Sequence, residues 1–213
     1  MAVITKIEVQ KRNKDRVNIY LDNEYAFSIS MELVYKEGLK SKMEIDVDRL
    51  RDIADKEGYL KCKNTALRIV ERSFKTEKEM RDKLKEKEYT DDQIEKTIEF
   101  LKEYKFINDE AYVNAYVNDK LSSRGRQKIK YDLIRKGIER NLIEEKLSDI
   151  DSDDEKNTAL NLAKKKYNSI KKSESDVYKI NGKLYRFLMS KGYNYELIKD
   201  VVKRVTNVTD EYL

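Results

Sequence analysis

The chain has 213 residues, with 46 Lys and Arg against 41 Asp and Glu, a formal net charge of +5, one cysteine, no histidine and no proline. Without histidine it has neither a zinc site nor a Ser-His or Cys-His pair. No glycine-rich phosphate loop is present either, so we expect no enzyme activity, cofactor or metal, with magnesium on carboxylates alone as the remaining alternative. A mean hydropathy of −0.86 and short apolar runs predict no membrane span and no signal peptide, and the lone cysteine fits a reducing cytoplasm.

The first 45 residues differ from the rest because apolar and polar residues alternate in them. The stretches ITKIEVQKR, RVNIYLD and YAFSIS have the period of two that is typical of strands, and NKD and NE mark the turns. We predict a small three-stranded meander followed by a short helix at MELVYKEG. So small a sheet is not stable alone, so we expect it to pack on the first helices of the remaining chain.

From residue 46 onward one sequence frame occurs three times. It reads LKEKEYTDDQI at 84–94, LIRKGIERNLI at 133–143 and LMSKGYNYELI at 188–198. Each copy starts with an anchor leucine, and an apolar residue precedes it by one helical turn, so the two share a face of a helix. The anchors and their partners are Leu84 with Met80, Leu133 with Ile129, and Leu188 with Leu184.

Each of these helices is expected to end in a left-handed residue four positions after its anchor. Gly137 and Gly192 suit that conformation, whereas Glu88 should cost about 1 kcal/mol there. The next residue in each copy is apolar or aromatic and is expected to pack back on the last turn. These residues are Tyr89, Ile138 and Tyr193.

A second helix is predicted ten residues after each anchor, from apolar residues at i, i+4 and i+7. These positions are Ile94, Ile98 and Leu101, then Ile143, Leu147 and Ile150, then Ile198, Val202 and Val205. Thr90 with Gln93 resembles a capping box, and Asn194 is a good N-cap, whereas Glu139 is a poorer one.

A further helical stretch precedes each anchored helix, at about 62–73, 110–122 and 156–169. Each unit is therefore predicted to be three helices, recurring after 49 and 55 residues. Such units stack in series, so we predict a mainly α fold of tandem three-helix repeats that form an elongated curved rod, with a small N-terminal β-meander. The predicted divisions are 1–45 for the strand-rich segment with its short helix, and 46–108, 109–151 and 152–213 for the repeats.

The positive charge is concentrated in the middle repeat. Residues 120–136 hold seven basic residues and one acidic residue. If Ser123 or a neighbour caps the next helix, an exposed helix N-terminus would lie among them and would suit a polyanion or an acidic protein surface. A solubilising face explains the charge equally well. The candidate binding residues are Lys120, Arg124, Arg126, Lys128, Lys130, Arg135 and Lys136.

Two further features have plainer interpretations. The acidic stretch DIDSDDEK at 149–156 favours a solvated hinge with an N-cap for the next helix. Tyr112, Tyr116 and Tyr131 could stack on nucleic-acid bases, but at helical spacing beside two valines they are more often core residues.

Two motifs of the middle repeat, FINDEAYVNAYV at 106–117 and RGRQKIKYDLIRKGI at 124–138, together resemble the RecX family of regulators of the RecA recombinase. The upstream stretch ALRIVERSFKTEKEMRDKLKEKEY is similar to the first repeat of that family, and the resemblance covers roughly residues 48–205. The family often has Gly-Pro where this chain has Gly125-Arg126.

The resemblance implies a non-catalytic regulator that binds RecA filaments on single-stranded DNA and restrains ATP hydrolysis and strand exchange. The sequence leaves the oligomeric state open, and we expect a monomer. The resemblance also places the chain in homologous recombination, DNA repair and the SOS response. The basic middle repeat would then face an acidic RecA surface or the DNA phosphates directly. A stand-alone DNA-binding helical-repeat protein and a generic helical scaffold are the alternatives, and a steep loss of naked-DNA affinity with salt would mark direct phosphate contact.

Overall fold

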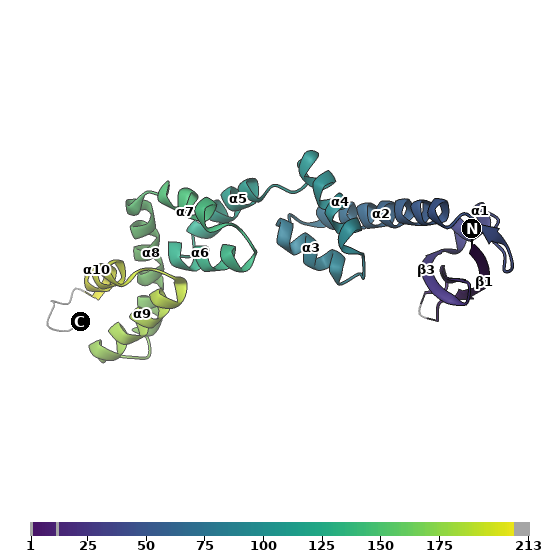
Figure 1. The fold of residues 1–213 in the computed structure, drawn as a ribbon. Coiled ribbons are helices and arrows are strands. Elements are labelled where there is room, and N and C mark those ends of the chain that lie inside the picture. Colours follow the sequence, from purple (N-terminus) through teal and green to yellow (C-terminus); the bar gives the residue numbers. More distant parts are fainter. Residues whose placement is uncertain (1, 12, 207–213) are drawn as a thin grey trace. The chain divides into compact units, whose positions relative to one another are not determined.

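The computed structural model describes residues 2–11 and 13–206, and within them it contains ten helices and four strands (Figure 1). This is the mainly α fold with a small N-terminal sheet that the sequence predicts. The chain divides into two compact units. One comprises the residues up to Ser73 together with Met80–Ile107, and the other comprises Phe74–Glu79 together with the residues from Asn108 onward.

The sheet is antiparallel, with the strand order β3-β2-β1-β4. Its first three strands form the predicted meander, and the turn between β2 and β3 has positive φ at Asp22 and Asn23, as a tight hairpin requires. The two-residue strand β4 was not predicted, because its pairing with Ala2 and Val3 leaves no alternating pattern. The strands are β1 (Ala2–Val9), β2 (Arg16–Leu21), β3 (Glu24–Ser30) and β4 (Glu44–Ile45).

The sheet packs on helices, as expected for a sheet too small to be stable alone. The short helix α1 (Met31–Lys36) follows β3, and the long helix α2 (Val47–Arg72) contributes Leu50 to the core of the sheet. Ser30, the N-cap of α1, donates its hydroxyl to the carboxylate of Glu57 on α2, which ties the end of β3 to that helix.

Helix α2 is the largest departure from prediction. The sequence VDRLRDIADKEG at 47–58 was expected to begin the helical part, and a separate stretch at about 62–73 to form the first helix of the repeat. The structure instead has one continuous helix of 26 residues, which starts at Val47 behind the N-cap Asp46. Its residues belong to two hydrophobic cores. Leu50 packs in the core of the sheet, whereas Cys62 and Ala66 pack in the core of the first repeat. A charged helix whose buried face changes partner half-way along has no single apolar stripe for a sequence pattern to detect.

Three repeats of three helices follow, which confirms the repeat prediction. Each repeat has its own core of buried side chains. The first repeat is α2, α3 (Glu77–Lys85) and α4 (Asp91–Glu103); the second is α5 (Asp109–Leu121), α6 (Arg126–Arg135) and α7 (Arg140–Ser148); the third is α8 (Ser152–Ile170), α9 (Val177–Lys191) and α10 (Tyr195–Thr206). The domain boundaries after residues 45, 108 and 151 stay a prediction. The arrangement of the repeats as a curved rod also stays a prediction.

The repeat frame itself has the predicted geometry. The three anchor leucines and the apolar residues one turn before them are all fully buried. Glu88, Gly137 and Gly192 all have positive φ, at 63°, 86° and 86°. The capping box of Thr90 and Gln93 is present, and Asn194 accepts from the backbone of α10, whereas Glu139 makes no side-chain cap.

Candidate partner-binding surface

Every one of the seven predicted basic residues lies within 4.0 Å of a carboxylate of the chain. Four of them have separate partners, and the other three share Asp132 on α6. The separate pairs are Lys120 with Asp119 at 2.5 Å, Arg126 with Glu155 at 2.9 Å, Lys130 with Glu144 at 2.7 Å and Lys136 with Glu79 at 2.6 Å. Much of the charge that looked free in the sequence is therefore neutralised locally.

Asp132 is the one acidic residue of the basic stretch, and its role was missed. It is buried, yet Arg124 and Arg135 donate to its carboxylate and Lys128 lies 4.0 Å away. Burial and the nearby carboxylate raise the pKa of Tyr116, whose hydroxyl also donates to Asp132. The signal was its spacing of three and four residues from two basic neighbours on the same helix. Three cations around one carboxylate leave a local positive excess.

The predicted exposed N-terminus of α6 is wrong. The N-cap is Gly125, which makes no side-chain cap, and Ser123 instead donates its hydroxyl to the carbonyl of Lys120 on the preceding helix α5. Gly125 N donates to the carbonyl of Lys191 at 2.9 Å, and Gln127 N donates to that of Gly192 at 3.2 Å. The absence of a side chain explains this contact, since a Cβ on Gly125 would overlap the carbonyl of Gly192.

Arg126 completes this packing, so it is a structural residue. Its backbone N–H donates to Glu155 at 2.9 Å, and its guanidinium donates to the carbonyl of Ile150 at 2.9 Å. Arg126 thereby ties α6 to the acidic segment that leads into α8. Arg124 has a similar structural role, since it bonds Tyr116 and the buried Asp132.

Three residues of α6 remain well exposed on one face of the helix. Lys128, Tyr131 and Arg135 follow an i, i+3, i+7 spacing, which places them on one side. The side chain of Arg135 is 82% exposed and that of Lys128 is 45% exposed, while Tyr131 as a residue is 67% exposed. We call these three residues the α6 stripe. Tyr131 is therefore a surface residue, contrary to the core interpretation, which does hold for the buried Tyr112.

An aromatic ladder lies beside the basic residues. The rings of Phe74 and Tyr112 stack with centroids 5.7 Å apart, and those of Tyr112 and Tyr116 follow at 6.0 Å. Lys136 Nζ lies 5.3 Å from the centroid of Tyr112. Phe74, which is 52% exposed, ends the ladder, and no sequence pattern singles it out.

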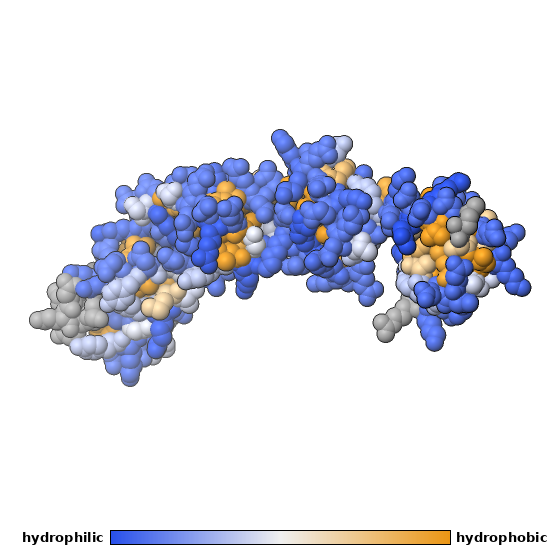
Figure 2. Space-filling view, viewed as in Figure 1, coloured by the Kyte–Doolittle hydropathy of each residue, from blue (hydrophilic) through white to orange (hydrophobic). Residues whose placement is uncertain are grey.

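The rest of the surface offers few other features. The face drawn in Figure 2 is mainly hydrophilic, and its apolar residues form small separate areas. Across residues 2–11 and 13–206, no helix is long and apolar enough to span a membrane, and no group of three or more cysteine, aspartate or glutamate side chains could hold a metal ion.

Comparison with known proteins agrees with the repeat structure. Family models match at four places along the chain: the N-terminal domain of the regulatory protein RecX at residues 2–46, and its first, second and third three-helix domains at 62–101, 108–147 and 153–202. The chain belongs to the RecX family. The RecX N-terminal model falls on the sheet, and the three RecX helical models fall on the three repeats.

Full-length RecX relatives are close in sequence. The regulatory protein RecX of Clostridium beijerinckii is 58% identical over 208 residues, 98% of each chain, and that of Clostridium perfringens strain SM101 is 53% identical over 213 residues, all of both chains. A crystal structure of a regulatory protein RecX has a TM-score of 0.64 at 29% identity and covers 94% of this chain and 100% of its own. That of RecX from Lactobacillus salivarius has 0.62 at 27%, covering 71% and 98%.

Proposed function

We propose that this RecX-family chain modulates, mainly by inhibition, the RecA recombinase. It binds RecA filaments on single-stranded DNA and restrains ATP hydrolysis and strand exchange, acting in the cytoplasm as a monomer without chemistry of its own. The observation that carries the proposal is the family membership over the N-terminal domain and all three repeats, together with full-length relatives named as regulatory proteins.

The surface we assign to this role is the middle repeat, with the α6 stripe as its contact face. Arg135 and Lys128 share one buried carboxylate with Arg124, so their charge is the least compensated of the basic set. Tyr131 adds an exposed ring between them, and aromatic and arginine side chains are enriched in protein interfaces. The other five basic residues each pair with a carboxylate of the chain and add to the positive field of the repeat.

Charge reversal of the stripe tests the assignment. The double variant Lys128→Glu, Arg135→Glu should bind RecA–single-stranded-DNA filaments about tenfold more weakly, because it replaces two attractive charges with two repulsive ones. Co-sedimentation with filaments and inhibition of RecA ATP hydrolysis measure the effect. Lys164→Glu, Lys165→Glu is the control, since it changes the net charge equally at two exposed lysines of α8. If the two double variants bind and inhibit alike, the stripe is not the contact face.

Direct DNA binding is the second candidate function, and the aromatic ladder favours it. Phe74 presents an exposed ring next to Tyr112 and Lys136, and a base stacked on such a ring gains about 1–3 kcal/mol. Affinity for bare single-stranded DNA would then fall steeply with salt. Inhibition of RecA at a salt concentration that abolishes binding to bare DNA would separate the regulatory role from simple DNA binding.

A further inference from the structure

The sheet has one long edge that no other strand covers. Strand β3 lies at the end of the order β3-β2-β1-β4, so it pairs with β2 on one side only. The other side of an edge strand carries backbone N–H and C=O groups that another extended chain can pair. Lysine and proline commonly protect such edges, and the β3 sequence EYAFSIS contains neither. A bulge at Ala26 interrupts its pairing with β2.

The backbone of Ser28 points toward this free edge. Ser30 N donates to the Glu57 carboxylate on α2 at 3.2 Å, so it points away from β2. Arg16, the partner of Ser30 in the register, uses its own backbone groups to bond the loop between β1 and β2. Backbone direction alternates along a strand, so Ser28 has the direction of Ser30.

One of the two edge groups of Ser28 is without a partner. Its carbonyl accepts from the Arg16 guanidinium at 2.8 Å. No helix, loop or side chain within residues 2–11 and 13–206 accepts from its N–H. Since Glu57 covers the end of β3 at Ser30, the open part of the edge is Tyr25–Ser28.

A groove with a volume of about 1210 Å³ runs along the same part of the edge. All four residues of Tyr25–Ser28 line it. Consecutive side chains of a strand point to opposite faces of the sheet, so four in a row border one groove where it follows the edge. Pockets for small molecules measure about 300–1,000 Å³, so this larger groove favours a longer, chain-like occupant.

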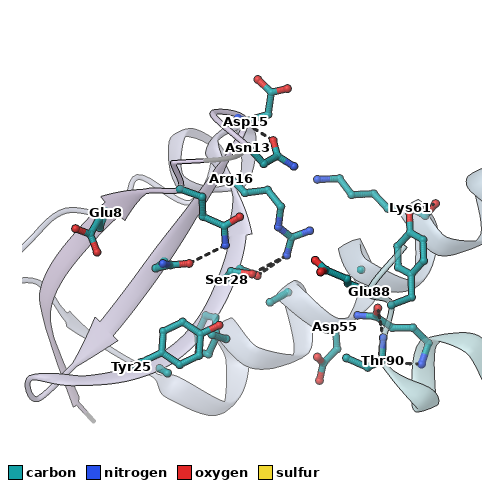
Figure 3. A pocket seen from close by; sticks show the side chains of 18 of the residues that line it. Glu8, Asn13, Asp15, Arg16, Tyr25, Ser28, Asp55, Lys61, Glu88 and Thr90 are labelled. Atoms are coloured by element: carbon teal, nitrogen blue, oxygen red, sulfur yellow. Dashed lines mark hydrogen bonds between the residues drawn. The ribbon is translucent and has the colours of Figure 1, made fainter. Parts of the chain in front are cut away.

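The opposite wall of the groove comes from the first repeat, in the same compact unit. Figure 3 shows Arg16 on the strand side, with its guanidinium pointing into the space toward Lys61 and Glu88 on the other side. Among the described residues, neither Arg16 nor Glu88 has an oppositely charged side chain within 4.0 Å. Donors and acceptors are therefore available on both walls.

The charges that line the groove are nearly balanced, with five basic and four acidic residues. A polyanion such as a nucleic acid favours a clear positive excess, which this groove lacks. A peptide main chain is neutral and presents one N–H donor and one C=O acceptor per residue. In an extended chain these groups alternate between its two edges. Main chain is therefore the occupant that complements both walls.

We propose that this groove binds an extended peptide segment of a partner protein, which adds to the sheet as a strand beside β3. A main-chain carbonyl of the segment accepts from the Ser28 N–H, and its outer edge bonds Lys61 and Glu88. Main-chain hydrogen bonds supply the affinity in this kind of recognition, and the side chains of the segment supply specificity. The inference rests on the proposed function, which makes the RecA filament the partner.

Ser28→Pro tests the added strand. Proline removes the N–H that points to the free edge, and such edge positions tolerate it. The variant should bind RecA–single-stranded-DNA filaments about tenfold more weakly in co-sedimentation. Ser28→Ala is the matched control, since it removes the hydroxyl that Arg16 bonds and keeps the N–H, so it should bind like the parent. Circular dichroism checks that both variants fold.

Hydrogen exchange of the unmodified chain gives a second readout that needs no variant. Filament binding should slow the exchange of the open β3 amides about tenfold or more, because they become paired. Strand β4 is the internal control, since it is the other edge of the same sheet and does not line the groove. Its exchange should not change. If Ser28→Pro does not fold, this measurement decides alone.

The outcomes separate the groove from the proposed function. Co-sedimentation without protection of β3, or equal binding by the folded proline and alanine variants, would overturn the groove and leave the proposed function standing. Protection of β3 that grows with the concentration of the chain alone would also overturn it, because a second copy would then pair with the edge. If the unmodified chain does not co-sediment with filaments, the proposed function fails, and the groove fails with it as a RecA site.

Discussion

Glu88 is the residue at which the repeat frame and local backbone preference disagree. Its φ of 63° is one that glycine adopts freely, and the equivalent positions carry Gly137 and Gly192. A non-glycine residue is disfavoured there by about 1 kcal/mol, offset in part because glycine makes the unfolded chain more flexible. The exposed side chain of Glu88 contributes little packing to set against that strain.

Glu88→Gly is therefore expected to stabilise the chain, by up to about 1 kcal/mol. Urea unfolding followed by circular dichroism measures the free energy of unfolding. Glu86→Gly is the matched control, because Glu86 has no positive φ and the added flexibility should only destabilise it. Equal effects of the two substitutions would mean that Glu88 is not strained.

Residue-level charge was the least predictable property. The sequence correctly located the basic cluster but could not assign partners to it, because Glu79, Glu144 and Glu155 come from other helices. The partners within one helix were open to inference, since Asp132 is spaced to meet Lys128 and Arg135. Counting formal charge therefore overstated the free positive charge.

At the scale of helices, periodicity predicted what lies within a repeat and not what joins repeats. Buried anchors, left-handed ends and caps follow from residues a few positions apart, so the pattern contains them. The contact of Gly125 with Gly192 joins residues far apart in the chain and needs both backbones in place. No local sequence pattern therefore predicts this contact of Gly125.

Gly125→Ala should disturb the contact between the start of α6 and the end of α9. The added methyl group would overlap the Gly192 carbonyl, and relief requires a backbone shift, at a cost of about 1–3 kcal/mol. Hydrogen exchange should show faster opening of the first turn of α6, and thermal unfolding should show a lower midpoint. Gly182→Ala is the control, because a Cβ there meets nothing within 4 Å and alanine is favoured inside a helix such as α9. A Gly125→Ala variant as stable as Gly182→Ala would show that α6 can move away from Gly192 without a loss of stability.

For the whole molecule, the absence of histidine sets the response to pH. No ordinary side chain titrates between about pH 5 and 8 without it, so stability should be flat there. On the acid side, Glu57 and Glu79 are the most buried of the carboxylates whose pKa is lowered. Burial opposes their ionisation, but hydrogen bonds from Ser30 and Lys61 lower the pKa of Glu57, and that from Lys136 lowers the pKa of Glu79.

On the alkaline side, burial raises the pKa of Cys62 above its ordinary value of 9.0, and it also raises the pKa of Tyr193. Burial, and to a lesser degree the charge of Glu155, raises the pKa of Tyr193 from 10.0 to about 12. The folded chain thus favours the protonated phenol, so this contribution is complete below pH 10 and is lost as the pH rises toward 12. The carboxylates have the opposite sign, so their contribution is complete above the ordinary value of 4.5 and is lost as the pH falls through their folded values.

The melting temperature should therefore be constant from about pH 6 to 8 and fall on both sides. Tyr193→Phe isolates the part of the alkaline fall that Tyr193 contributes. The Tyr193 hydroxyl is buried and has no hydrogen-bond partner in the described part of the chain, so its removal should raise the free energy of unfolding at neutral pH by about 1 kcal/mol. The variant should also lose less stability than the parent between pH 9 and 11, since it has no phenol to ionise on unfolding. Calorimetry of both chains across pH 3–11 measures the two effects together. A variant that is less stable at neutral pH, or that follows the parent through the alkaline range, would contradict the assignment and indicate that the hydroxyl has a polar partner.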